Sequence, residues 1–212
     1  MQKETYTVLE NGVIHQTSYN KIDYNYDYSN KYNNYGEKGN YLGYLRLGTL
    51  IGAIGEIPKR ILDVGYGNGA FLSAAKTIIP YCAGCDLSPY PVPEDCHRVE
   101  SLTDAEYDVI TFFDSLEHFD DITIIKSLKC KYIFISVPWC PTTDASSVSF
   151  LNWYHRRPNE HLWHFNKDSL TTFFGECGYD EVIGGLAIED AIRKNAAVAP
   201  KPNILTALFK RQ

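Results

Sequence analysis

The chain has 212 residues, of which 44% are hydrophobic, and its 26 acidic and 20 basic side chains give a net charge of −6. This length suits one sizeable hydrophobic core, so we expect a single folded domain. The negative net charge and the absence of a long run of Lys or Arg argue against sequence-independent binding of duplex nucleic acid.

Membrane and redox signals are also absent. The first residues lack the basic-then-apolar pattern of a secretory signal, and no apolar stretch reaches the ~20 residues that cross a bilayer. We therefore expect a cytoplasmic protein with no membrane partner, whose six scattered cysteines are mostly reduced. The spacing of Cys82 and Cys85 also occurs in zinc and redox sites, but no second pair accompanies it and we interpret both as core residues.

Residues 1–40 form a segment of their own, rich in Tyr and Asn. Nine of the sixteen tyrosines precede residue 45, and the segment shows no clean apolar period. This pattern predicts irregular structure, while the aromatic content favours packing over disorder. We expect the segment to cover the active site, so that deletion to about residue 38 weakens ligand binding. Residues 41–212 then form the single main domain.

The main domain alternates helix and strand signals. The spacing of apolar residues over 41–55 predicts an amphipathic helix. Strands are predicted at 60–64, 81–86, 97–100, 107–113 and 132–137, and helices at 70–79 and 122–128. Strands rich in Ile, Val and Phe that alternate with helices indicate an α/β fold, in which helices cover both faces of a mostly parallel sheet. A helix at 167–177 and strands at 180–185 and 204–209 predict a closing antiparallel hairpin.

Two stretches depart from this alternation. Residues 87–96 contain Pro89, Pro91 and Pro93, so the usual crossover helix is expected to be absent. Residues 139–166 have no strong period and are rich in Trp, Tyr, His and Arg. Because long irregular segments in compact domains are usually functional, we expect this one to form part of a binding site.

A glycine-rich turn follows the first strand of the alternation. Gly65, Gly67 and Gly69 let the backbone approach a ligand, but this spacing also satisfies the dinucleotide fingerprint. Asp63 discriminates between the two, because its carboxylate would repel a diphosphate and attract a sulfonium and an amino group. Asp86, at the end of the second strand, is placed to accept the hydroxyls of a ribose. The pattern favours a cationic nucleoside cofactor.

Five segments in order carry a family resemblance: residues 62–72, 85–89, 107–119, 132–139 and 160–179. They resemble the class I S-adenosylmethionine-dependent methyltransferases, in particular the group that includes the ubiquinone-biosynthesis O-methyltransferases. The resemblance covers most of the chain beyond Arg60. It implies a Rossmann-like methyltransferase domain over residues 41–212 and S-adenosylmethionine as the cofactor.

The resemblance also implies roles for individual residues. The methionine part of the cofactor would lie against Asp63 and the glycine loop at Gly65, Gly67 and Gly69, and its ribose against Asp86 and Leu87. The adenine would lie by Ser101 and Leu102, and the methyl end by Phe113 or Asp114. Arg46 is a candidate partner of the cofactor carboxylate, although a solvated surface arginine fits the sequence equally well.

Asp114, Glu117 and His118 follow the fourth predicted strand and are candidate ligands of a divalent metal. Some of the similar methyltransferases bind metal through E-x-x-E-H at this position, whereas here the first residue is an aspartate, one methylene shorter. The alternative is that Glu117 and His118 only form hydrogen bonds at the start of the next helix. A metal would need a further ligand, His161 or His164, and packing beside Trp163 and Phe165 is the alternative for those two residues.

The resemblance implies methyl transfer, and we expect an oxygen atom of a small molecule as acceptor. Candidate general bases are His118, His161 and His164, since an imidazole titrates near neutral pH. Three alternatives stay open. The first is a metal-dependent RNA ribose 2′-O-methyltransferase, suggested by the acid-acid-His cluster and by Arg156 and Arg157. The others are a non-catalytic cofactor-binding domain and an NAD-dependent reductase. No pattern in the chain specifies the acceptor or the oligomeric state.

Overall fold

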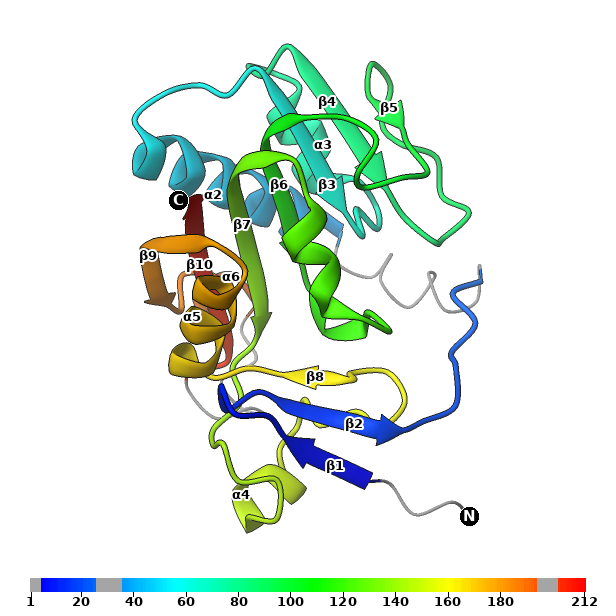
Figure 1. Ribbon diagram of the computed structural model, residues 1–212. Coiled ribbons are helices and arrows are strands. Elements are labelled where there is room, and N and C mark those ends of the chain that lie inside the picture. Colours follow the sequence, from blue (N-terminus) through cyan, green and yellow to red (C-terminus); the bar gives the residue numbers. More distant parts are fainter. Residues whose placement is uncertain (1–4, 26–35, 194–201) are drawn as a thin grey trace.

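The structure, a computed structural model, describes residues 5–25, 36–193 and 202–212, and its centre is a seven-stranded sheet (Figure 1). The strand order is β5-β4-β3-β6-β7-β10-β9, in which the series from β5 to β7 is parallel and β10 is antiparallel to both of its neighbours. The strands are β3 (Arg60–Val64), β4 (Tyr81–Cys85), β5 (His97–Arg98), β6 (Tyr107–Phe113), β7 (Cys130–Pro138), β9 (Tyr179–Leu186) and β10 (Ile204–Arg211). The predicted α/β sheet with its closing antiparallel hairpin is confirmed.

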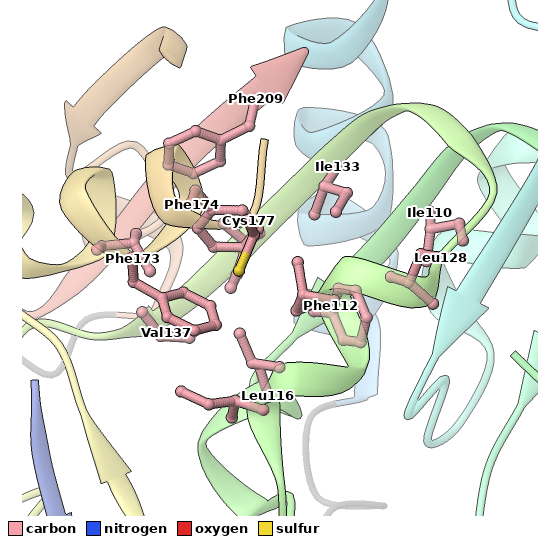
Figure 2. Packing of buried hydrophobic residues seen from close by; sticks show 14 of the residues in the cluster. Ile110, Phe112, Leu116, Leu128, Ile133, Val137, Phe173, Phe174, Cys177 and Phe209 are labelled. Carbon is pink, nitrogen blue, oxygen red and sulfur yellow. The ribbon is translucent and has the colours of Figure 1, made fainter. Parts of the chain in front are cut away.

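The central strands are apolar because both faces of the sheet are covered. Successive residues of β7 alternate between two cores: Ile133 packs into one hydrophobic cluster and Phe134 into the other. Figure 2 shows the first core, where Val137 of β7 lies beside Phe173 of helix α5 (Lys167–Glu176) and Phe112 of β6 belongs to the same cluster. The second core lies under helices α2 (Gly36–Ile54) and α3 (Ala70–Ala75). This two-sided burial is the arrangement that the apolar runs predict.

The helices are α2 (Gly36–Ile54), α3 (Ala70–Ala75), α4 (Val148–Leu151), α5 (Lys167–Glu176) and α6 (Asp190–Arg193), with 3-10 helices η2 (Leu116–His118) and η3 (Ile122–Ser127). Helix α2 begins five residues before the predicted start at Tyr41. Its Gly43 permits close packing, since a Cβ there would lie 2.5 Å from the carbonyl oxygen of Ala70. The segment predicted as a short helix at 122–128 is the 3-10 helix η3.

A second, three-stranded sheet has the order β1-β2-β8 (Figure 1). Its strands are β1 (Thr5–Val8), β2 (Ile14–Ser18) and β8 (Trp163–His164). The prediction of irregular structure over residues 1–40 is therefore wrong for the two strands within 5–18. Their hydrogen-bond partner, β8, lies in the long segment 139–166, and this pairing over about 150 residues leaves no local signal in the sequence.

Residues 86–96 contain no helix, as the three prolines predict, and β5 is reduced to two residues. All six cysteines are free. Cys82 is buried in β4, where burial raises the pKa of its thiol to about 12, which disfavours the reactive thiolate. None of the described helices is long and apolar enough to cross a membrane.

Candidate functional site

A cavity of about 1020 Å³ lies where the strand order reverses between β3 and β6, at the carboxyl ends of the strands. Open α/β sheets bind their ligands at this point, because loops that leave adjacent strands diverge there. Four parts of the chain form most of the wall: the glycine loop after β3, the loop after β4, the segment from Phe113 to Thr123, and residues 154–162. The cavity thus collects segments that are far apart in the sequence.

The glycine loop carries a buried acid at its entrance. Gly65, Gly67 and Gly69 have φ values of 75°, 53° and 73°, in the left-handed region that favours glycine. The carboxylate of Asp63 accepts a hydrogen bond of 2.6 Å from the hydroxyl of Thr111. Burial raises the pKa of Asp63 to about 7, against the opposing effects of Thr111 and the more distant Arg46. A cation bound in the cavity would restore the ionised form.

Gly65 cannot be replaced without moving its neighbours. A Cβ at this position would lie 2.5 Å from the Cβ of Ser115, and the φ of 75° is unfavourable for any L side chain. We expect Gly65→Ala to destabilise the protein by about 3 kcal/mol and to lower its melting temperature by about 6–12 °C. Gly48→Ala is the matched control, because a Cβ there would have no atom beyond its own helix within 4 Å, and alanine favours the helix. An equal fall in the melting temperatures of both variants, measured by thermal denaturation, would contradict the steric argument.

Asp86 is held at the end of β4 by two amides. One carboxylate oxygen accepts a hydrogen bond of 2.8 Å from the amide of Gly67, and the other accepts one of 2.6 Å from the amide of Ser88. Each oxygen keeps a lone pair for a further donor, such as a ribose hydroxyl. Of the other residues predicted to hold the nucleoside, Leu87 and Leu102 line the cavity, whereas Ser101 and Gly69 are not part of its wall.

Arg46 is buried in an ion network and is not a surface arginine. Its Nε and Nη2 donate to the two carboxylate oxygens of Glu189 at 2.8 and 3.0 Å, and its guanidinium lies 4.1 Å from the ring centre of Phe113. Glu189 also accepts hydrogen bonds from Arg193 and from the hydroxyl of Ser136. Although burial opposes ionisation, the two guanidinium groups hold the pKa of Glu189 below its usual range. Sequence reasoning did not identify this acid.

Asp114 belongs to the same network. Its carboxylate accepts a hydrogen bond from Nη2 of Arg193 and lies 3.6 Å from Nη2 of Arg46. Its φ of 54° is unusual for a residue other than glycine and turns the chain out of β6 toward the cavity. The structure therefore places Asp114 and Phe113 on the cavity wall, and it pairs Asp114 with arginines.

The group of potential metal ligands in the described parts of the chain is Glu117, His118 and His161, whose ligand atoms all lie within 4.8 Å of one another. Asp114, the first member of the predicted set, is not in this group, and His161 is. His161 comes from the segment 139–166, which was predicted to form part of a binding site. The three residues line the same cavity as Asp63 and Asp86.

The surroundings of this group suit a cation. Glu117 is 1% exposed, and neither of its carboxylate oxygens has a hydrogen-bond partner within the described residues. Burial, reinforced by the charge of Asp114, raises the pKa of Glu117 well above its usual value. Nδ1 of His161 lies 2.8 Å from the carbonyl oxygen of His155, which only accepts, so Nδ1 carries the proton and Nε2 a lone pair. Burial lowers the pKa of both His118 and His161, which keeps them neutral.

His164 lies outside the cavity. Its ring packs against Tyr6, Phe150 and Trp153, and burial lowers its pKa to about 3. The structure thus does not bring His164 to the other predicted catalytic residues. It supports the alternative of packing for this histidine.

The chain that follows β2, residues 19–24, lines the cavity beside His118, and we call it the strap. The hydroxyl of Tyr19 and the ammonium of Lys21 both donate to the carboxylate of Asp120, at 2.9 and 2.6 Å. The hydroxyl of Tyr24 lies 3.4 Å from Nδ1 of His118. Sequence reasoning placed the N-terminal segment over the site but did not identify these contacts, which join residues about 100 positions apart.

Comparison with known proteins gives one family. The model of a methyltransferase domain matches residues 37–182, whereas no curated protein sequence matches the chain significantly. Among solved structures, the plantazolicin methyltransferase in complex with a monoazolic substrate analogue and S-adenosylhomocysteine (SAH) is 15% identical, with a TM-score of 0.59, and the match covers 88% of this chain and 89% of that one.

Two further structures are similar. The 1,6-didemethyltoxoflavin N1-methyltransferase of Burkholderia thailandensis is 12% identical, with a TM-score of 0.57 and coverage of 98% of this chain and 99% of that one. The magnesium protoporphyrin IX methyltransferase of Synechocystis, with bound SAH, is 14% identical, with a TM-score of 0.53 and coverage of 83% and 87%. At such low identity these likenesses establish the fold.

Proposed function

Because this chain belongs to the methyltransferase-domain family, we propose that it transfers the methyl group of S-adenosylmethionine to an oxygen atom of a small molecule in the cavity. S-adenosylmethionine is the cofactor of this methyltransferase. One observation carries the proposal: a single cavity joins a bare glycine loop with buried Asp63 to a group of neutral imidazoles and a buried carboxylate. The first part suits a cationic nucleoside and the second suits proton removal from an acceptor.

The cofactor would lie along the carboxyl ends of β3 and β4. Its sulfonium and amino groups are cationic, which favours a position beside Asp63 and the glycine loop at Gly65 and Gly67. The ribose would donate to the free lone pairs of Asp86, and the methyl end would face Phe113 and Asp114. Arg46 is the candidate partner of the cofactor carboxylate, although two of its nitrogens are already engaged by Glu189.

The acceptor would lie on the side of His118 and His161. Both imidazoles are kept neutral by burial, so each can take a proton from a hydroxyl at neutral pH. A hydroxyl oxygen becomes a much better nucleophile as it loses its proton, whereas an amine attacks in its neutral form. This need for a base supports an oxygen acceptor. The toxoflavin relative methylates nitrogen according to its name, so the fold alone does not fix the acceptor atom.

A divalent cation is part of the proposal, because the donor set fits one. A carboxylate with two unpartnered buried oxygens beside an imidazole lone pair is costly unless a cation or a proton neutralises it. Glu117, His118 and His161 would hold the ion. In that case the two imidazoles would act as ligands and not as bases. The ion would bind the acceptor oxygen and lower the pKa of its hydroxyl, so that the proton could pass to water. In that case the carbonyl oxygen of His155 orients the ring of His161 as a ligand.

The cavity favours a small acceptor over RNA. Arg157, one of the two arginines that suggested RNA, lines the cavity and forms an ion pair with Glu160 at 3.0 Å. Arg156 donates to the carbonyl oxygen of Leu151 at 3.1 Å. Both guanidinium groups thus have partners inside this molecule, and the chain is acidic overall.

Two measurements test the proposal. Isothermal titration with SAH is expected to show binding, and no binding to folded protein would overturn the assignment of the cofactor site. Transfer of a radiolabelled methyl group should then be screened over small hydroxyl, carboxyl and amino compounds, RNA and protein, with and without Mn²⁺. Label in small hydroxyl compounds supports the proposal. Label confined to amines, RNA or protein would overturn the acceptor class, and SAH binding without any turnover would favour a non-catalytic domain.

We also propose that the strap covers the occupied cavity. Replacing its two Asp120 partners together, in the variant Tyr19→Phe/Lys21→Met, should release the strap and raise the Kd for SAH about fivefold, since exposed contacts of this kind contribute less than about 1 kcal/mol each. Lys131→Met is the matched control, because it removes a comparable surface ion pair, with Glu56, away from the cavity. Equal Kd values for the double variant and the control would rule out a covering role.

A further inference from the structure

The loop after β4 has lost its crossover helix and yet presents groups to the cavity. Residues 86–96 are irregular, but Asp86, Ser88 and Tyr90 all line the cavity. The hydroxyl of Ser88 is buried and has no partner in the described residues, which leaves it available to a ligand. A loop without regular hydrogen bonds needs another means of holding these groups in place.

Arg98, at the end of the short strand β5, supplies four hydrogen bonds. Its Nη2 donates to the carbonyl oxygens of Asp86 and Ser88, at 2.7 and 3.1 Å. Its Nη1 donates to the carbonyl oxygen of Tyr90 at 2.9 Å and to the hydroxyl of Tyr66 at 2.8 Å. One guanidinium thus gathers three carbonyl groups of the loop, which a planar fork with several donors can do and a lysine ammonium cannot do in the same geometry.

Tyr66 joins the same contacts to the glycine loop. It stands between Gly65 and Gly67, and its hydroxyl donates to the carbonyl oxygen of Tyr90 at 2.5 Å. Its ring needs the space beside Gly84 of β4, where a Cβ would lie 2.5 Å from the Cδ1 of Tyr66. The amide of Gly67 in turn donates to Asp86. The two loops that face the cavity are therefore locked to each other by Arg98 and Tyr66.

We infer that Arg98, with Tyr66, is the positioning residue of the nucleoside half of the site: it replaces the missing crossover helix and fixes Asp86 and Ser88 for the ribose. This inference rests on the proposed function. Arg98 itself is not part of the cavity wall, and its side chain is 33% exposed, so its effect on the ligand passes through the loop.

The test uses Arg98→Lys, which keeps the charge and loses the fork. We expect the Kd for SAH to rise about tenfold. The variant loses two or more hydrogen bonds from a charged donor, and the lysine recovers part of that loss. Arg60→Lys is the matched control, because Arg60 packs on the ring of Tyr81 and donates to Glu106 at the opposite end of the sheet. Its Kd should stay within about twofold of the original protein.

A double-mutant cycle separates positioning from a general loss of stability. If Arg98 acts through Asp86, Arg98→Lys should cause little further loss of SAH affinity once Asp86 is replaced by Ala. The double variant should then bind SAH about as weakly as Asp86→Ala alone. Additive losses, or a Kd of Arg98→Lys equal to that of the original protein, would overturn the inference. Thermal denaturation checks that each variant is folded.

A measurement without ligand keeps the inference separate from the proposed function. Amide hydrogen exchange in the ligand-free protein should accelerate at Gly67 and Ser88 in Arg98→Lys and not in Arg60→Lys, since both amides are bonded to Asp86. Unchanged exchange would show that Arg98 does not hold the loop. Failure of the original protein to bind SAH would overturn the proposed function, whereas unchanged exchange in a protein that binds SAH would overturn only the role of Arg98.

Discussion

Replacing Glu117 by Gln is expected to abolish the response of this protein to divalent metal and to reduce methyl transfer by about 100-fold or more. In the original protein, Mn²⁺ at about a hundred times its Kd should add about 2.7 kcal/mol of stability and raise the melting temperature by about 5–10 °C. Glutamine has the shape of the acid but binds the ion poorly, so the variant should show no such rise. Thermal denaturation with and without Mn²⁺ measures both effects.

In metal-free protein, Glu117→Gln is expected to leave the stability unchanged or to raise it. The pKa of Glu117 is raised by burial, so the folded state holds the proton more tightly than the unfolded state does. Its contribution to stability is therefore present at low pH and is lost as pH rises through the folded pKa. Glu117→Gln lacks this loss and should be as stable as the original protein or more so near neutral pH with chelator.

Asp114→Asn is the control that separates the two candidate ligand sets. Asp114 is paired with Arg193 and lies outside the group formed by Glu117, His118 and His161. The asparagine variant should therefore keep the metal-induced rise in melting temperature. A rise that survived in Glu117→Gln, or that vanished in Asp114→Asn alone, would contradict the ligand set seen in the structure.

The sheet could be predicted because its signals are local. Strands buried on both faces leave continuous apolar runs, and the bounds of β3, β6 and β7 agree with the predicted ones to within two residues. The glycine loop was equally visible, because positive φ values at three alternate positions strongly favour glycine. The missing crossover helix followed from three prolines in ten residues.

The ion network around Glu189 had no local signal. Arg46 and Glu189 are 143 positions apart, and Glu189 lies in a polar stretch without a period. The sequence shows an arginine on a helix, but whether it meets solvent or an acid depends on how α2 and α6 pack. For the same reason the aspartate of the predicted metal set was assigned to the wrong neighbours: Arg193 reaches it from the far end of the chain.

The spacing of the two histidines in residues 160–164 indicates that only one of them can face the cavity, but it does not indicate which one. In an extended chain residues three apart point to opposite faces, so His161 and His164 cannot both face one cavity. The structure places His161 beside His118 and His164 among Tyr6, Phe150 and Trp153. Which of them faced the cavity depended on the pairing of β8 with β2, and nothing in the local sequence specifies that pairing.

Replacing Asp63 by Asn is expected to raise the Kd for S-adenosylmethionine by about 10- to 100-fold, because a buried carboxylate paired with a cation is worth about 1.5–3 kcal/mol as a hydrogen-bond partner. Asparagine keeps the hydrogen bond with Thr111 and removes only the charge. The loss should be larger for the sulfonium cofactor than for SAH, its neutral-sulfur product. Equal losses for the two ligands would locate the effect of Asp63 away from the sulfonium.

The raised pKa of Asp63, about 7, gives this binding a pH dependence of definite sign. In the ligand-free protein the acid is half protonated near neutral pH, and the cationic ligand binds the ionised form, so binding releases about half a proton at pH 7. Affinity should therefore rise with pH from 6 to 8 and level off above it. Calorimetry at pH 7 in two buffers of different ionisation enthalpy measures the released proton, and Asp63→Asn should remove both the release and the slope. A slope that persists in this variant would assign the titration to another group.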